Sequence, residues 1–390
     1  MAHPPLTERA LTAAEFAERL HRTRREMAAR GLAALLVVSP ENVYYLAGLN
    51  HLGYFAFTLL VVPLDGRPRL VTRAMERPTV AAQAPDCVHV TFADDEDPAQ
   101  AARRAVREVT KPGDRVGLER TSMFLPVAIW ESTRSSFDDL EWADASGLVD
   151  GLRAAKSATE IRFVRRAAEI SDRAMQAGIA AVRSGVNERE VAAAVYAEMV
   201  LAGSEQPGIP PLIRSADLLR QEHVTWRDRV VDPGESLLFE LSGSVARYHA
   251  PLSRMVYLGR PPSGTPAAAE IALAGEQAVL DSLRPGALAA DVYESWQRVI
   301  DAGLGHRGYR RHHCGYLVGI GFPPSWVGGG AVVGLRRGSE LIIREGMVFH
   351  VLSWLLGQRP ADYVLSDTVL VTANGGELLT TTARDPIVVS

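Results

Sequence analysis

The stretch LLFELSGSVARYHAPLSRMVYLG, residues 237–259, has the composition and spacing of a strand pair that delivers ligands to a metal. An apolar strand carries the acidic Glu240, a turn of small residues follows, and a return strand leads to Arg254. Carboxylates on paired strands suit divalent metals that activate water. On the return strand, however, Pro251 stands where a second carboxylate would be needed. The stretch therefore indicates either a metal site or a former metal site.

Two titratable residues in this region could carry acid–base chemistry. Glu240 ends an apolar strand, where burial would raise its pKa and prepare it for proton transfer or nucleophilic attack. His223 precedes that strand in QEHVTWRDRV, and an imidazole can serve as general acid or base near neutral pH. The alternative for Glu240 is a structural ion pair with Arg254 or Arg247.

Histidines elsewhere are further candidates for substrate contacts. His249 follows Tyr248 on a strand, so the two side chains face opposite sides of the sheet and only one can enter a pocket. His313, next to His312 in RRHHCG, fits a basic surface cluster as well as a pocket. His350 in MVFHV is typical of a core histidine, with substrate binding as the alternative.

Three aromatic residues, Trp226, Phe322 and Trp326, could form a wall that holds a cationic ring through cation–π contacts. Ordinary core packing is the alternative for each of them. Together with Tyr248 and Arg254, they complete the set that we expect near the substrate in this half of the chain.

The elements that must position these residues change character near residue 150. Residues 1–150 alternate strand and helix: a buried strand in LAALLVVS, a hairpin in TLLVVPLDGRPRLVT, and helices at about 97–110 and 124–135. This alternation predicts an α/β domain.

Residues 151–390 begin with long helices and continue into strands. Ser157 and Glu160 form a capping-box pattern before a helix of about 25 residues, and Asn187 caps a second helix. Helices grouped around antiparallel strands predict an α+β domain.

The composition excludes several classes of protein. The length of 390 residues favours two domains, and a net charge of −4 gives no basic footprint for nucleic acid. Two distant cysteines form no disulfide framework, and the sequence has neither a secretory signal nor an apolar run long enough to span a membrane. We therefore expect a cytoplasmic protein that binds neither membranes nor nucleic acid.

The chain also resembles a known family over nearly its whole length. The matching pieces, in order, are LRAAKSATEIRFVRRAAEISDRAM, VVDPGESLLFELSG, GYLVGIGFPP, REGMVFHV and SDTVLVTANGGELLT. They resemble the creatinase/prolidase family. The resemblance implies a catalytic domain with the pita-bread fold, residues 151–390, preceded by a smaller creatinase-type domain, residues 1–150.

Metallopeptidases of that family bind two metal ions through two aspartates, a histidine and two glutamates. In this sequence those positions correspond to Glu240, Pro251, Tyr316, Leu352 and Ser366. Since proline and leucine have no ligand atom, the resemblance implies no metal and no other cofactor here. It also puts His223 at an active-site histidine and points the Tyr316 hydroxyl into the old metal cavity.

Within the family, HVTW, ELSGSVARYHAPLSR and GYLVGIGFPPSW resemble the ectoine hydrolases, which also lack the metal ligands. The resemblance implies metal-independent hydrolysis of a small C–N substrate, with an ectoine-like cyclic amidine favoured. Glu240 would act as nucleophile or base, His223 as proton shuttle, and Tyr316 would orient the substrate. The alternatives are a creatinase-like amidinohydrolase, a lyase or cyclase on the same fold, and a silent member that only binds a ligand.

Family members of this layout usually pair so that the first domain of one subunit reaches the pocket of the other. We therefore expect a homodimer in which NHLGYFAF, with His51 and Tyr54, lies close to the partner's active site. Besides a second copy of the chain, the expected partner is a small-molecule substrate.

Overall fold

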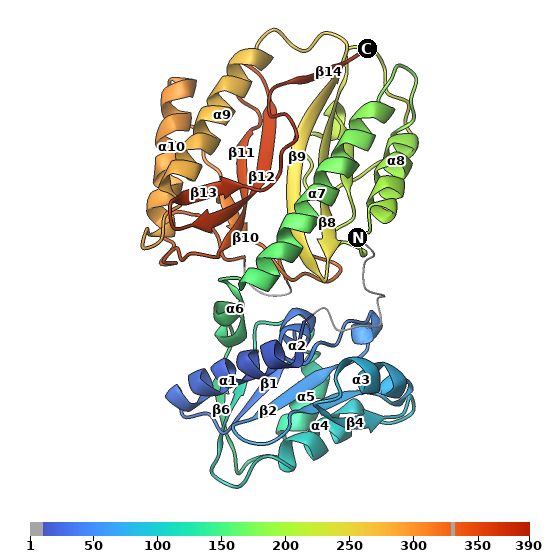
Figure 1. Cartoon of the computed structure of the whole chain (residues 1–390), viewed down its shortest axis with the longest axis vertical. Helices are drawn as coiled ribbons and strands as arrows, with labels where there is room; N and C mark the ends of the chain where they lie inside the picture. The colour runs from blue at the N-terminus through green and yellow to red at the C-terminus, as the bar shows by residue number, and fades with distance from the viewer. Residues whose placement is uncertain (1–10, 329–331) are drawn as a thin grey trace. The chain divides into compact units, whose positions relative to one another are not determined.

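The computed structural model describes residues 11–328 and 332–390 (Figure 1). The chain divides into two compact units: the first runs to Arg153 and also includes Gly328, and the second consists of Ala154–Val327 and Val332–Ser390. No helix within the described ranges combines the length and apolar character that a membrane crossing requires.

The first unit is built on a six-stranded sheet of order β4-β3-β2-β1-β5-β6. Its centre is the fully buried strand ALLV, whose neighbours on either side run antiparallel and parallel to it. The predicted hairpin is present as two of these strands. The strands are β1 (Ala34–Val37), β2 (Leu59–Pro63), β3 (Arg69–Arg73), β4 (Val88–Phe92), β5 (Arg115–Leu118) and β6 (Glu141–Asp144).

Helices connect these strands, so the first unit has the predicted α/β character. A capping box of Thr12 and Glu15 begins its first helix. The helices are α1 (Ala13–Ala29), α2 (Pro40–Ala47), α3 (Arg77–Gln83), α4 (Pro98–Arg107), α5 (Val127–Arg134) and α6 (Leu148–Arg153), with short 3₁₀ turns at η1 (Gly53–Phe55) and η2 (Ala74–Glu76).

The second unit is built on an eight-stranded sheet whose main path is β10-β11-β12-β9-β8-β7. Two short strands complete it, one paired with β12 and one with β9. The strands are β7 (Leu212–Ser215), β8 (Ser236–Val245), β9 (Tyr248–Leu258), β10 (Gly315–Leu317), β11 (Val348–Leu355), β12 (Tyr363–Thr372), β13 (Gly375–Leu378) and β14 (Ile387–Val389).

Four helices accompany this sheet in the described part of the second unit, as the α+β class requires (Figure 1). The predicted capping boxes are formed by Ser157 with Glu160 and by Asn187 with Glu190. The helices are α7 (Ala158–Ala181), α8 (Glu188–Leu201), α9 (Thr265–Ser282) and α10 (Ala289–Leu304), with a 3₁₀ turn at η3 (Ala216–Leu218).

The helices cover one face of the second sheet. Phe239 and Leu241 of β8 belong to a core cluster with residues of α7 and α8. Further along the sheet, the indole of Trp296 on α10 donates a hydrogen bond to Ser353 on β11. Side chains alternate along a strand, so residues such as Glu240 and Leu352 lie on the opposite face. We call it the Glu240 face.

The register of β8 and β9 is fixed by a two-residue turn. Val245 pairs with Tyr248, and the turn residues between them, Ala246 and Arg247, have φ values of 49° and 64°. Positive φ at both central residues is the geometry of a type I′ hairpin turn. The backbone N–H of Arg247 donates to Glu205 over 2.7 Å, which helps to hold this unusual turn.

Candidate active site

A row of directly paired residues runs across the Glu240 face. Glu240 on β8 pairs with Ser253 on β9, and Ser253 pairs with Ser366 on β12. Ser366 in turn pairs with Leu352 on β11. Next to the row, Tyr316 on β10 pairs with His350 on β11. Strands far apart in sequence therefore bring these side chains onto one surface.

A chain of buried hydrogen bonds leads toward Glu240. The indole N–H of Trp326 donates to the Tyr316 hydroxyl over 3.0 Å, and that hydroxyl lies 2.8 Å from His350 Nδ1. His350 Nε2 lies 2.7 Å from Ser366 Oγ, which donates to Ser253 Oγ over 2.7 Å.

These contacts fix the direction of the hydrogen bonds. A hydroxyl has one hydrogen, so Ser366, which donates to Ser253, accepts from the Nε2–H of His350. Nδ1 of the same neutral ring then accepts from the Tyr316 hydroxyl. The chain ends at the Ser253 hydroxyl on the Glu240 face, which accepts from Ser366 and donates to no side chain or backbone group within residues 11–328 and 332–390.

Glu240 is a buried carboxyl whose pKa is raised to about 7, mainly by burial. The charge of Arg214 acts in the opposite direction, that of Glu222 raises the pKa, and that of Arg311 lowers it. Burial and the nearby Glu240 charge also raise the pKa of Tyr316, so its phenol stays protonated. A carboxyl with a pKa close to neutral can both take up and release a proton at physiological pH.

His350 and His313, the two histidines beside Tyr316, are neutral at physiological pH. Burial lowers the pKa of His350 to about 3, with a smaller effect from His313. Burial also lowers the pKa of His313 to about 3, with smaller effects from His312 and Arg311. The His313 ring stands edge-on to the Tyr316 ring, with 5.3 Å between the ring centroids. His350 and His313 thus meet around Tyr316 without adding positive charge.

His223 lies in the loop between β7 and β8, where it is exposed and has φ 59°. The charge of its neighbour Glu222 raises the pKa of Glu240. The Glu222 carboxylate forms an ion pair with Arg311 over 3.5 Å. The loop therefore belongs to the electrostatic surroundings of Glu240. No hydrogen bond within the described ranges joins the His223 imidazole to Glu240.

Two predicted substrate contacts lie on the other face of the sheet. The Tyr248 hydroxyl donates to Glu160 of α7 over 2.6 Å. Arg254 forms a fully buried ion pair with Asp367 over 2.8 Å. Strand alternation turns both side chains away from Glu240, so we correct their expected role: they are structural residues of the helix-covered face.

His249 lies on the Glu240 face, but the backbone occupies both of its ring nitrogens. Nε2 accepts from the N–H of Gly208 over 2.8 Å, and Nδ1 lies 3.3 Å from the carbonyl of Gly319. Burial lowers the pKa of His249 to about 4. The ring therefore joins two loops to β9 as a neutral group.

The expected aromatic wall is not a single surface. Trp226 packs against the core cluster under α8, edge-on to Tyr196 with 5.8 Å between the ring centroids. Phe322 lies under the guanidinium of Arg247, which is 4.6 Å from the ring centroid. Only Trp326, through its bond to Tyr316, joins the hydrogen-bond chain that leads to Glu240.

Tyr54 belongs to the first unit. Its ring stands edge-on to His51 and to Phe124, with centroid separations of 6.4 and 5.6 Å. Its neighbours Leu52 and Phe55 are 48% and 79% exposed. The segment therefore presents apolar side chains on the surface of the first unit.

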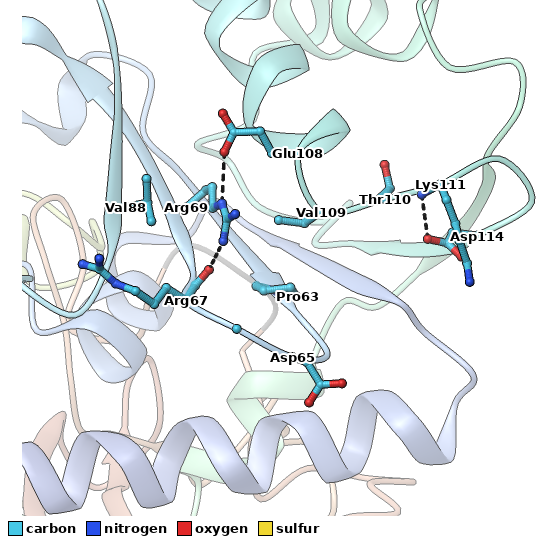
Figure 2. A pocket seen from close by; sticks show the side chains of 11 residues that line it. Pro63, Asp65, Arg67, Arg69, Val88, Glu108, Val109, Thr110, Lys111 and Asp114 are labelled. Carbon is cyan, nitrogen blue, oxygen red and sulfur yellow. Dashed lines mark hydrogen bonds and ion pairs between the residues drawn. The ribbon is translucent and has the colours of Figure 1, made fainter.

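A separate pocket of about 600 Å³ lies in the first unit, between the β2–β3 hairpin and the end of α4 (Figure 2). Figure 2 shows two of the hydrogen bonds in its lining: Arg69 donates to Glu108, and Asp114 accepts from the backbone N–H of Lys111. Its lining holds none of the predicted catalytic residues.

Two residues of this site were not predicted from the sequence. Ser253 is the cross-strand partner of Glu240 and the end of the hydrogen-bond chain. Arg214 is a buried arginine on β7, which pairs with β8. A lone arginine in the apolar segment PPLIRSADLL is a signal that could have drawn attention to Arg214.

Comparison with known proteins decides the family. The model of metallopeptidase family M24 matches residues 162–373, and the creatinase/prolidase N-terminal domain matches residues 19–155. The chain belongs to family M24. The predicted family resemblance and the pita-bread fold with its creatinase-type first domain are thereby confirmed.

Relatives in this family are hydrolases and peptidases. Ectoine hydrolase of Halomonas elongata is 29% identical over 391 residues, covering 94% of this chain and 96% of that protein. The Xaa-Pro dipeptidase of Pyrococcus horikoshii is 25% identical over 354 residues, covering 91% and 94%. The crystal structure of a prolidase from Thermococcus sibiricus superposes with a TM-score of 0.86 at 22% identity, covering 97% of this chain and all of that one.

Metallopeptidases bind metal, so the donor atoms at the five corresponding positions show whether this site could do the same. Of the five ligand positions, Pro251 and Leu352 have no donor atom, while the Tyr316 and Ser366 oxygens are engaged in hydrogen bonds with His350. Within residues 11–328 and 332–390, no three acidic, histidine or cysteine side chains gather as metal ligands would. The donor set does not fit the two-metal centre of the peptidases.

Proposed function

We propose that this M24 protein is a metal-independent hydrolase that cleaves a C–N bond of a small substrate with an amidinium-like carbon, with an ectoine-like cyclic amidine favoured. The observation that carries the proposal is Glu240, a buried carboxyl with a pKa of about 7 beside an ordered chain of neutral hydrogen-bonding groups. The similarity to ectoine hydrolase over almost the whole chain supports the substrate class.

The reaction needs a nucleophile for the amidinium carbon, a proton for the departing nitrogen and a negative group that balances the charge of the substrate. Water, activated by Glu240, forms a bond to the amidinium carbon; one C–N bond then breaks, and the departing nitrogen takes a proton. Direct attack by the Glu240 carboxylate, followed by hydrolysis of the ester-like intermediate, is the second route. In either route Glu240 also balances the positive charge of the substrate, and His223 shuttles the proton.

The hydrogen-bond chain would orient and stabilise rather than store a proton. Neutral His350 fixes the Ser366 hydroxyl, which fixes Ser253 beside Glu240. An imidazolium on this face would repel a cationic amidinium, whereas the depressed pKa values of His350 and His313 keep both rings neutral. Tyr316, protonated and held by Trp326, donates to His350 and would donate to the substrate only by giving up that bond.

Three alternatives use the same residues. A creatinase-like amidinohydrolase would also place a carboxylate against a planar cation, and a lyase or cyclase would use Glu240 for proton transfer alone. A silent member would bind a ligand without turnover. The near-neutral pKa of Glu240 favours the enzymes, since a purely binding carboxylate gains nothing from being half protonated.

We also propose that the protein is a homodimer in which residues 51–57 approach the partner's active site. The exposed side chains of Leu52 and Phe55 support an interface at this segment. A monomer in light scattering at micromolar concentration would contradict this proposal.

The decisive test is an assay of ectoine and creatine in buffer with excess chelator, together with elemental analysis of the purified protein. Turnover of ectoine in chelator with far less than one equivalent of bound transition metal supports the proposal. Turnover of creatine alone favours the amidinohydrolase, and activity that chelator abolishes and metal restores rejects metal independence. Ligand-induced thermal stabilisation without any turnover supports the silent member.

A further inference from the structure

Arg214 is a buried arginine whose guanidinium has no hydrogen-bond partner among the residues that the structure describes. Its side chain is 1% exposed, and its Nε, Nη1 and Nη2 atoms donate to no residue within 11–328 or 332–390. Leu212 of β7 lies opposite Glu240, and Arg214 lies opposite Leu238. Since side chains two residues apart share a face, Arg214 lies on the Glu240 face.

No carboxylate in the described part of the chain accepts a hydrogen bond from Arg214. The charges that raise its pKa against the effect of burial are those of Glu240 and Glu222. Neither accepts a hydrogen bond from Arg214 among the described residues. Glu222 is instead turned to Arg311, at 3.5 Å. The guanidinium therefore keeps its donors unused while it is removed from water.

Two further polar atoms nearby are also buried and unpartnered within the described part of the chain, Arg311 Nε and His313 Nδ1. The charge of Arg311 acts on Glu240, and the His313 ring contacts Tyr316. Native proteins rarely bury such groups without partners, and those that do so commonly use them to bind a ligand. An anion that accepts hydrogen bonds would satisfy this set.

We propose that Arg214 binds a carboxylate of the substrate, so that the substrate is a small zwitterion with its cationic C–N group at Glu240. This inference rests on the proposed function and narrows its substrate class. A guanidinium presents paired N–H groups that match the two oxygens of a carboxylate, which is stronger and more specific than a single bond. Ectoine has this chemistry, because its amidinium ring carries a carboxylate.

The test compares ectoine with methyltetrahydropyrimidine, which keeps the amidinium ring and lacks the carboxylate. In the wild-type protein, we expect kcat/KM for ectoine to exceed that for the carboxylate-free ring by roughly 10⁴–10⁵, the range for a site built to bind a polar group that the analogue lacks. In Arg214→Met, this ratio should fall toward one. Arg214→Lys should recover only part of it, because an ammonium cannot form the paired bonds.

Stability separates a binding role from a structural one. Removing a buried charge without partners should leave the melting temperature of Arg214→Met equal to or above the wild-type value. Arg173→Met, which removes an exposed arginine paired with Glu198, is the control and should change neither the ratio nor the melting temperature. Equal losses of kcat/KM for both ring compounds, or a lower melting temperature of Arg214→Met, would overturn the proposal.

Failure of the proposed function is recognised separately. If the wild-type protein turns over neither ring compound, the substrate is different, and the anion site is then tested with acetate alone by calorimetry. Acetate binding with a Kd of about 1–10 mM that is lost in Arg214→Met supports the site. Wild-type protein that binds no acetate in this range overturns it.

Discussion

Two arginines of the second sheet, Arg214 and Arg254, are equally buried at 1% exposure but differ in their hydrogen bonds and in the face of the sheet on which they lie. Arg254 donates to Asp367 and to the carbonyls of Ala383, Ser253, Ser366 and Thr382. Arg214 donates to no described residue. Arg254 lies on the helix-covered face and Arg214 on the Glu240 face.

The comparison indicates that the two faces of the sheet differ in role: the helix-covered face stabilises the fold, and the Glu240 face holds the candidate active site. On the helix-covered face, the charge of Arg254 is fully used by the fold, and it joins β9, β12 and the segment that leads to β14. On the Glu240 face, the charge of Arg214 is buried without a described partner, and we propose that a ligand uses it. A stability measurement and an activity measurement should therefore respond oppositely to changes on the two faces.

The largest expected effect is on stability, from Arg254→Met. The change leaves Asp367, which is fully buried, without its cation and should lower the free energy of unfolding by about 3–5 kcal/mol. Urea denaturation measures this loss. The surface variant Arg165→Met, which removes an exposed pair with Glu377, is the control and should lie within about 1 kcal/mol of wild type. Wild-type stability of Arg254→Met would remove the contrast between the two faces.

The next effect is on turnover, from Glu240→Gln. The amide keeps the volume of the side chain and removes its charge and basicity, so kcat should fall by at least ~100-fold while the melting temperature changes little. Glu198→Gln on the surface of α8 is the control and should leave kcat unaltered. Retention of near wild-type turnover by Glu240→Gln would reject the mechanism.

His223→Ala sharpens this result. A similar loss is expected if His223 shuttles the proton, and the double variant should lose less than the product of the two single losses if the residues act as one unit. Since His223 is exposed and forms no described bond to Glu240, an undiminished kcat in His223→Ala would assign the proton transfer to Glu240 itself.

A third effect is on the pH dependence. If the ionised carboxyl is the nucleophile or base, kcat/KM should rise with pH and level off above about 7, and Glu240→Gln should lose this limb. The free energy of unfolding should fall over the pH range in which kcat/KM rises. A folded pKa raised from 4.5 to about 7 stabilises the fold fully below 4.5, and this contribution is lost as the pH rises through 7. Unfolding curves from pH 4 to 8 for wild type and Glu240→Gln measure it; parallel pH dependences would contradict the raised pKa.

The smallest effect is expected for Ser253→Ala. It removes the end of the hydrogen-bond chain and should lower stability by about 1 kcal/mol and kcat by roughly tenfold, the scale of one hydrogen bond. Ser135→Ala, at an exposed serine of the first unit, is the control. A kcat loss in Ser253→Ala without any shift in the pH limb is the expected signature of an orienting group, and an unaltered kcat would show that the chain does not serve the reaction.

Much of this protein follows from the sequence by itself. The capping boxes at Ser157 and Asn187 and the apolar periodicity of the helices are local signals, and they predict elements close to those observed. The motifs around Glu240 and Tyr316 identify the family, and they show which residues stand at its metal-ligand positions. Such features depend on neighbours in sequence, so the sequence determines them.

The tertiary structure alone decided which side chains meet. His249 rather than Tyr248 lies on the Glu240 face because the strands are joined by a two-residue turn, Ala246 and Arg247, with positive φ at both residues. The sequence did not reveal this turn, because it lacks the glycine or asparagine that usually occupies such positions. Ser253, Ser366 and His350 form one chain only because β9, β12 and β11 pair in a particular register across more than a hundred residues. A slip of one residue would turn each of these side chains to the other face, and no local pattern in the sequence fixes that register.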